Sequence, residues 1–263
     1  MTGSGTWDRR RLAADLAALG VRPGLSILTH ASLRRIGAGA DTVLTALLDV
    51  VGPEGTVVVP AFTADNSDTS PSYLRRTRDL TESQVVAFRA KMPPFERERT
   101  RSQGMGQLAE AVRCARGAVR SAHPQTSFAA LGARAGELVA GHDEECHLGE
   151  RSPLARLERA GAYVLLLGVG YEVCSAFHLA EYRLANPPRR IYRCVVLRGG
   201  VRTWVSYEDV ALDDRDFGEL GAEFEASGMT AVGRGRIGDA QAVLFPLARA
   251  VEFAAGWLAG KRR

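Results

Sequence analysis

The chain has 263 residues, 46% of them hydrophobic, and a formal net charge of +4 at pH 7. A chain of this length buries a core large enough to need no disulfide or metal for stability, which excludes a small cross-linked scaffold. Its 34 lysines and arginines are nearly balanced by 30 acidic residues. This mild basic excess is compatible with nucleic acid, anionic lipid or a phosphorylated cofactor, and it favours none of them.

The cysteines and the N-terminus indicate the cellular compartment. Cys114, Cys146, Cys174 and Cys194 are widely spaced and form no CxxC pair, which fits a reducing environment. The N-terminal residues carry no apolar stretch of the signal-peptide kind. The longest apolar runs, such as Tyr163 to Val169, are too short to span a bilayer. We therefore expect a cytoplasmic protein that is not bound to a membrane.

The first sixty residues alternate between helical and strand patterns. Leu12, Leu16 and Leu19 recur at helical spacing between Thr6, a candidate N-cap, and Gly20, a candidate stop. The segments that follow are a strand at 25–29, a polar loop at 30–40, a helix at 41–51 capped by Asp41, and a strand at 56–60. This alternation predicts an α/β layered fold, in which ligands bind at the strand ends.

Residues 64–101 break this pattern with a long polar segment that contains prolines and many arginines, and only residues 82–91 are expected to be helical. The later predictions are helices at 107–112, 129–139, 177–184 and 244–258, a strand at 162–168, a hairpin of 193–197 and 201–206 around Gly199-Gly200, and a frayed basic end at 261–263. Neither an internal repeat nor a clear linker interrupts the sequence. We expect one domain over residues 1–263.

His178 and Glu181 are the first candidates for chemistry. They lie three residues apart in a predicted helix, so both side chains emerge on one face. Histidine accepts a proton near neutral pH, and a carboxylate orients and stabilises the imidazolium, which suits attack by an amine. A plain surface pair on the helix is the alternative interpretation. Cys174, four residues before His178, is either a nucleophile paired with that histidine or a buried structural cysteine.

Other polar segments allow weaker interpretations. His123 precedes Pro124, which favours an extended loop that projects the histidine toward a ligand, although a local turn gives the same pattern. The cluster from His142 to His147 resembles a metal site, but its members are too close in sequence for many of them to reach one ion, so we expect no metal. The arginines of residues 64–101 suit phosphates, yet few stacking aromatics accompany them, so RNA recognition is poorly supported.

Taken together and in order, four motifs point to one family. They are THASLRRIGAG (29–39), QGMGQLAEAVR (103–113), GAVRSAHPQTSF (117–128) and FHLAEYRL (177–184). In this order and spacing the chain resembles the aminoglycoside 3-N-acetyltransferase family from about Leu12 to Leu258.

The resemblance implies a three-layer α/β/α sandwich that differs from the GCN5-related acetyltransferase fold. It implies acetyl-CoA as the acyl donor, an amine acceptor such as an aminoglycoside antibiotic, no metal and no covalent enzyme intermediate. By the same resemblance, His178 is catalytic and Glu181 supports it. The implied coenzyme contacts are His30, Ala31, Ser32, Leu33, Met105, Gly106, Ser121, His123 and Ser127.

Three departures from the family pattern concern the ligands. Ala31-Ser32 stands where many relatives have two serines, and a threonine-rich approach to the histidine is absent at 174–177. In residues 64–80, Asp65 and Asp68 are candidates for binding acceptor ammonium groups, but the arginines that follow would repel a polycation. This conflict motivates an alternative acceptor, a less cationic amine modified in natural-product self-protection or biosynthesis.

Two functions of other classes compete with acyl transfer. A nucleic-acid-binding module would use the basic surface, and a hydrolase would use Cys174 with His178. We expect neither nucleic acid nor membrane as a partner. The oligomeric state is left open by the sequence, with a homodimer as one option.

Overall fold

The computed structural model describes residues 7–228 and 233–262. Within these ranges the main sheet contains seven strands: β1 (Ser26–Ala31), β2 (Thr56–Pro60), β3 (Val119–Arg120), β4 (Phe128–Gly132), β5 (Tyr163–Leu167), β8 (Gly233–Ile237) and β9 (Ala240–Pro246). Their spatial order is β3-β4-β2-β1-β5-β9-β8. The three central strands β2, β1 and β5 run parallel, whereas β4 and β9 pair antiparallel with the outer sides of β2 and β5.

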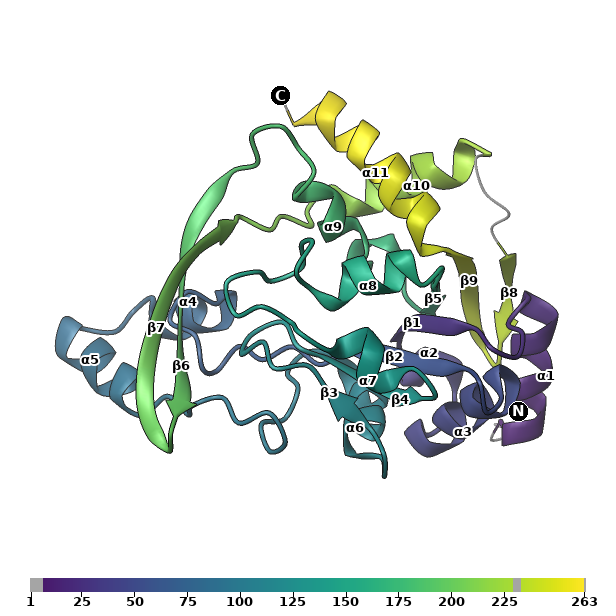
Figure 1. Ribbon diagram of the computed structural model, residues 1–263, viewed down its shortest axis with the longest axis horizontal. Helices are drawn as coiled ribbons and strands as arrows, with labels where there is room; N and C mark the ends of the chain where they lie inside the picture. Colours follow the sequence, from purple (N-terminus) through teal and green to yellow (C-terminus); the bar gives the residue numbers. More distant parts are fainter. Residues whose placement is uncertain (1–6, 229–232, 263) are drawn as a thin grey trace.

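Helices cover both faces of this sheet (Figure 1). One face carries α1 (Arg9–Leu19), α3 (Ala40–Val51) and α6 (Gly106–Cys114), and the other carries α7 (Ala135–Val139), α8 (Pro153–Arg159), α9 (Phe177–Glu181), α10 (Phe217–Ala226) and α11 (Leu247–Lys261). Successive strand residues serve opposite cores: Ile27 and Val57 pack in the first, and Leu28 and Val58 in the second. The predicted three-layer α/β/α sandwich is confirmed.

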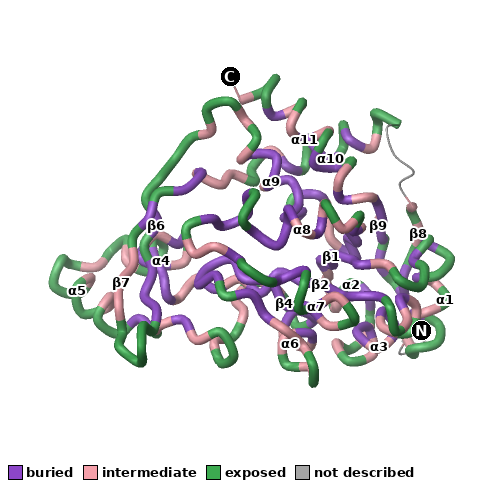
Figure 2. The backbone as a smooth tube through the Cα atoms, viewed as in Figure 1, coloured by how far each residue is buried: buried purple, intermediate pink, exposed green. Residues whose placement is uncertain are grey.

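A separate hairpin projects from this sandwich. It consists of β6 (Arg189–Arg198) and β7 (Val201–Val210), as predicted around Gly199-Gly200, and it packs against α4 (Pro71–Thr77) and α5 (Glu82–Ala90). Tyr73 and Met92 form a small core there with Val195. Figure 2 shows that buried backbone is concentrated in the central strands, whereas α5 is largely exposed. The polar segment 64–101 is therefore the support of the hairpin.

The helix predicted at 129–139 is wrong in its first half. Residues from Phe128 to Gly132 form β4, which pairs with β2, and helix α7 begins only at Ala135. Gly132 has φ +134°, and a Cβ there would lie 2.2 Å from the carbonyl oxygen of Gly55. Ala129 and Ala130 are good helix formers, so tertiary pairing overrides local propensity here.

Several predicted boundaries also shift. Strand β1 continues to Ala31, so His30 belongs to the strand and not to the loop, and the C-terminal helix starts after the strand β9 that ends at Pro246. The predicted cap Thr6 lies outside the described residues, and helix α1 is capped by Asp8, which accepts a hydrogen bond from Arg11 N at 2.9 Å. Gly20 ends that helix with φ +109°, as predicted.

The chain end differs from the prediction as well. Arg263 lies outside the described residues, but Arg262 is held by several carboxylates and is not frayed. The two single turns α2 (Leu33–Ile36) and η1 (Tyr171–Val173) were not predicted. Among the helices of the described part, the longest is α11 with 15 residues, and none has the length and apolar character needed to cross a bilayer.

Candidate active site

A cavity of about 830 Å³ opens where β1, β2 and β5 end. Because these three strands are parallel, their carboxyl ends meet at the same edge of the sheet, which is where ligands bind in α/β folds. Its walls include Thr29 to Leu33 at the end of β1 and Gly104 to Ala109 at the start of α6. After β5, Val169, Glu172, Val173 and Ser175 line it, together with His178, Asp214 and Phe217.

His178 and Glu181 form the ionisable pair of this cavity. The Nδ1 atom of His178 lies 2.6 Å from Oε2 of Glu181 along helix α9. The Glu181 side chain is only 2% exposed, whereas that of His178 is 13% exposed and reaches the cavity. The Phe217 ring packs against the imidazole with a centroid distance of 4.7 Å. With Nδ1 engaged by the carboxylate, Nε2 is the nitrogen left to exchange a proton with a ligand.

A second histidine lines the cavity from β1. His30 is 8% exposed, and burial, with a further contribution from the charge of His178, lowers its pKa to about 4. It is therefore neutral near pH 7. His30 Nε2 and Thr29 Oγ1 are both buried without a hydrogen-bond partner in the described part of the protein. Buried polar atoms normally have partners, so these two indicate a place for water or ligand atoms.

The start of helix α6 favours a negatively charged ligand. Met105 occupies its N-cap without a side-chain hydrogen bond, and its first turn contains no acidic residue. The free backbone amides and the helix dipole at such an end attract anions. Gly106 has φ +81° and faces Ala31 across the cavity, and the exposed Arg34 adds a positive charge. These features fit the phosphates and amides of coenzyme A.

Six of the nine residues assigned to coenzyme contacts line this cavity, namely His30, Ala31, Ser32, Leu33, Met105 and Gly106. Ser121, His123 and Ser127 do not, because all three are buried at 2% exposure or less. The hydroxyl of Ser127 donates to the Ala61 carbonyl at 2.9 Å, and that of Ser121 bonds His142 Nδ1 at 3.0 Å. These buried side chains stabilise the loop beside β2 by hydrogen bonds and do not line the cavity.

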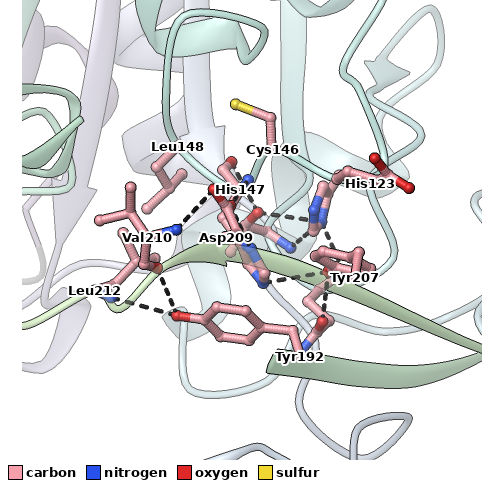
Figure 3. Close-up of polar contacts among 12 residues, drawn as sticks. His123, Cys146, His147, Leu148, Tyr192, Tyr207, Asp209, Val210 and Leu212 are labelled. Carbon is pink, nitrogen blue, oxygen red and sulfur yellow. Dashed lines mark hydrogen bonds and ion pairs between the residues drawn. The ribbon is translucent and has the colours of Figure 1, made fainter. Parts of the chain in front are cut away.

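His123 belongs to a buried cluster of histidines (Figure 3). Its ring centroid lies 4.7 Å from that of His142 and 4.6 Å from that of His147. His123 Nδ1 accepts from the backbone amides of Gln125 and Thr126, at 3.1 and 3.0 Å. The local turn that was the alternative interpretation for His123 is therefore present.

The same cluster ties the hairpin to the sandwich. In Figure 3, Asp209 of β7 accepts from both the backbone amide and Nδ1 of His147, at 2.8 and 2.9 Å. The Tyr207 hydroxyl donates to Gln125 Oε1 at 2.8 Å. The nitrogens of His142 are shared between Ser121 and the carbonyl oxygens of Cys146 and His147 (3.1 and 2.9 Å). The motif at 142–147 thus has a structural role in joining two parts of the fold.

The two aspartates predicted to bind the acceptor lie away from the cavity. Asp68 is buried and pairs with Arg89 at 2.8 Å and Arg193 at 3.1 Å. Asp65 pairs with Arg76 at 3.2 Å. These pairs support the hairpin and its helices. Of the arginines at 75, 76 and 78 that were expected to repel a polycation, Arg76 is paired with an aspartate.

Glu172 and Asp214 are the acidic residues that do line the cavity, and the sequence reasoning missed both. Both are exposed. The Glu172 carboxylate accepts from the amide of Gly170 at 3.2 Å, which leaves its other oxygen available. The signal for Asp214 was the acidic run that precedes Phe217. Nothing in the local pattern marked Glu172, because only the fold brings its turn beside α9.

Cys174 is a structural residue. Its side chain is fully buried, and burial raises its thiol pKa to about 12. It does not line the cavity that His178 enters. A nucleophilic cysteine requires an accessible thiolate, so a Cys174/His178 hydrolase does not fit this site.

The fold and the site are those of an α/β enzyme that has a histidine–glutamate pair in a strand-end cavity suited to an anionic coenzyme. The sequence pattern described as "Aminoglycoside 3-N-acetyltransferase" matches residues 28–259. The chain belongs to this family, as its motifs indicated.

Individual relatives agree over nearly the whole length. The chain is 37% identical to aminoglycoside N(3)-acetyltransferase VII of Streptomyces paromomycinus, over 98% of this chain and 93% of that protein. The crystal structure of the YokD protein from Bacillus subtilis matches with a TM-score of 0.90 at 34% identity, covering 98% of this chain and 96% of that one. A structure named AAC-IIIb binary with CoASH matches with a TM-score of 0.82 at 34% identity, covering 97% of both chains.

Proposed function

We propose that this protein transfers the acetyl group of acetyl-CoA to an amine of an aminoglycoside, with His178 as general base and Glu181 as its support. The observation that carries the proposal is the 2.6 Å contact between His178 Nδ1 and Glu181 Oε2 at the wall of the cavity. Membership of the family supports the reaction class. The related Streptomyces enzyme is itself named for N(3) acetylation of aminoglycosides, which supports the acceptor.

The chemistry requires an uncharged amine. Acetyl-CoA supplies an acyl carbon activated as a thioester, and the acceptor nitrogen must lose a proton as its bond to that carbon forms. Glu181 holds the proton of His178 on Nδ1, so Nε2 carries the lone pair that accepts the proton from the amine. Glu181 then stabilises the imidazolium. The carbon–sulfur bond breaks, and the departing coenzyme A thiolate takes up that proton and leaves as the thiol. A positioned general base contributes about 10²- to 10⁴-fold to the rate.

The coenzyme is proposed to lie along the end of β1 and the start of α6. Ser32 and Leu33 with Met105 and Gly106 form its walls, and Arg34 meets its phosphates. His30, neutral near pH 7, provides a polar ring that is not charged and therefore does not compete with His178 for protons. The buried Ser121, His123 and Ser127 support these walls from behind.

The acceptor is proposed to bind through Glu172 and Asp214. Ammonium groups favour a cleft with carboxylates, and these two line the cavity beside His178. The net charge of +4 is therefore compatible with a polycationic substrate, since acidic residues gather at the cavity. The argument for a less cationic amine rested on the arginines at 75, 76 and 78, and it is weakened only at Arg76, which pairs with Asp65.

We also propose a cytoplasmic location. The four cysteines are free in the fold, and Cys114 is exposed, which suits a reducing compartment. We further propose that the chain forms one domain. Hydrogen bonds between Asp209 of the hairpin and His147 of the sandwich join these two parts and support this proposal.

The experiment is thiol release from acetyl-CoA by the purified protein, measured with a panel of aminoglycosides and, separately, of simple monoamines. We expect release with aminoglycosides and acetylation of one amine, located by mass spectrometry and NMR. The Lys261→Ala variant serves as a surface control, because its ammonium contacts the exposed Glu219. Stabilisation by coenzyme A without release from any aminoglycoside would contradict the proposed acceptor and leave the acyl donor standing.

A further inference from the structure

Both carboxylate oxygens of Glu181 are engaged, and only one of them by His178. The second oxygen, Oε1, accepts from the backbone amide of Asp213 at 3.0 Å and from Nη1 of Arg262 at 2.5 Å. Glu181 is 1% exposed, so its negative charge has almost no contact with water. A buried carboxylate in this state depends on the protein for its counter-charge. Arg262 supplies that charge.

Arg262 reaches this place from the far end of the chain. It follows helix α11, which packs against α9, and Figure 1 shows the chain ending just beyond α11. Its Nε donates to Asp216 Oδ2 at 2.8 Å and its Nη2 to the carbonyl of Asp213 at 2.6 Å. The guanidinium is therefore fixed at three corners, and its side chain is only 19% exposed.

This arrangement keeps the arginine charged and rigid. Burial by itself would lower the pKa of Arg262, but its hydrogen bonds to Asp216 and Glu181 outweigh burial and raise the pKa. A planar guanidinium with several fixed donors holds a carboxylate in one orientation, which an ammonium does less well. The positive charge of Arg262 also offsets the negative charge of the Glu181 carboxylate that orients the histidine.

We propose that Arg262 is a positioning residue of the acyl-transfer site, which holds the Glu181 carboxylate in place and directs it at His178 Nδ1. The inference rests on the proposed role of His178 as a base, and it extends that site to the last residues of the chain. His178, Glu181 and Arg262 form a linear series from the cavity wall to the C-terminal end of α11. Arg262 is not among the residues that line the cavity His178 enters, so its effect on that cavity passes through Glu181.

The charged groups around His178 and Glu181 determine how removal of the Arg262 guanidinium affects the base. His30 on β1 and Asp214 face the same cavity as His178, and Asp213 and Asp216 lie beside Arg262. Removing the guanidinium leaves the carboxylates unopposed. They then favour the protonated form of the base, which makes it ineffective at a pH where the wild type is active.

The test compares Arg262→Gln, Arg262→Lys and the neighbouring control Lys261→Ala, whose ion pair with Glu219 is exposed. For Arg262→Gln we expect kcat to fall about 10- to 100-fold, the range for a misplaced catalytic group. The acidic limb of its pH profile should move to higher pH, while coenzyme A binding stays within about twofold by calorimetry, since Arg262 is remote from the coenzyme walls. Arg262→Lys keeps the charge and should recover part of the rate and the wild-type profile.

A second readout does not depend on turnover. Nitrogen-15 NMR of histidine-labelled protein reports which ring nitrogen of His178 carries the proton, and the wild type should show it on Nδ1. In Arg262→Gln this preference should be reduced, whereas Lys261→Ala should match the wild type. An unchanged tautomer and pH profile in folded Arg262→Gln, judged by circular dichroism, would overturn the proposal. If the wild type transfers no acetyl group, the proposed function fails, and the NMR comparison still decides whether Arg262 positions the pair.

Discussion

His30 at the end of β1 and His178 on α9 line the same cavity, and the charge of His178 disfavours protonation of His30. The two histidines therefore have different roles. His178 has a carboxylate behind it, and His30 has none among its described contacts. A carboxylate stabilises the imidazolium that a base forms, which supports the proposal that His178 is the base and His30 a neutral ring.

The first prediction concerns the base itself. His178→Ala should lower kcat by about 10²- to 10⁴-fold, the contribution of a general base. Binding of coenzyme A should persist, because the walls assigned to the coenzyme lie on β1 and α6. Steady-state kinetics and calorimetry check both parts. Turnover within a few-fold of wild type would remove His178 from the mechanism.

Glu181→Gln tests the partner of the base. The amide retains the size of the side chain but loses the charge that stabilises the imidazolium, so turnover should fall and its pH dependence should shift. Glu219→Gln is the matched control, since Glu219 is exposed and pairs only with the surface ammonium of Lys261 in the described contacts. A pH profile of Glu181→Gln that superimposes on that of this control would argue against the supporting role.

Cys174→Ala should keep its activity. The thiol is fully buried with its pKa raised to about 12, so it supplies no thiolate at neutral pH. The substitution removes one buried atom and should cost about 1 kcal/mol of stability, which thermal unfolding measures. Loss of all turnover in a folded Cys174→Ala variant would instead favour the Cys174/His178 hydrolase.

The buried histidines should make the protein sensitive to mild acid. Burial lowers the pKa of His30 and His142 to about 4, and burial with the charges of His147 and His142 lowers that of His123 well below its ordinary value. A histidine whose pKa is lower in the folded state contributes its full stability above about pH 6.5, the unfolded value, and loses it as the pH falls toward 4. For His142 the loss is on the order of 3 kcal/mol.

Urea unfolding at several pH values between 7.5 and 4.5 checks this expectation. Most carboxylates titrate below that window, so the histidines dominate the slope. Replacing His142 by Gln should lower stability at pH 7.5, because its bonds to Ser121 and two carbonyls are lost, but it should also flatten the dependence on pH. A free energy of unfolding that is constant across the window contradicts the prediction.

Gly132→Ala should destabilise the fold by about 1 to 3 kcal/mol or more, the cost of a side chain in a disfavoured backbone conformation. Gly132 has φ +134°, and the added Cβ would meet the Gly55 carbonyl oxygen at 2.2 Å. Gly136 in helix α7 is the control, since a Cβ there meets nothing within 4 Å. Gly136→Ala should leave stability equal or slightly raised. Equal denaturation midpoints for the two variants would show that the backbone at Gly132 has room for a side chain beside the Gly55 carbonyl oxygen.

The local sequence pattern was sufficient to predict many of the helices and strands. Apolar periodicity and turn residues predicted α1, α3, β2 and β5, and the two glycines at 199–200 predicted the hairpin. Each of these segments packs on the face that its own hydrophobic spacing presents. The order of the motifs was sufficient for the family, and the spacing of His178 and Glu181 already placed both on one side of a helix.

The tertiary structure decided what depends on distant partners. Ala129, Ala130 and Leu131 are good helix formers, yet they become part of a strand because β2 offers them backbone hydrogen bonds. From the sequence, Asp68 was a candidate ligand for ammonium groups. In the structure it forms ion pairs with Arg89 and Arg193 instead. From the sequence, Arg262 was expected to belong to a frayed end. In the structure, helix α11 places it in contact with Glu181. Sequence alone determines the faces of each element and the chemistry that each motif can support, whereas only packing determines which charges meet, because an ion pair between distant segments leaves no local pattern.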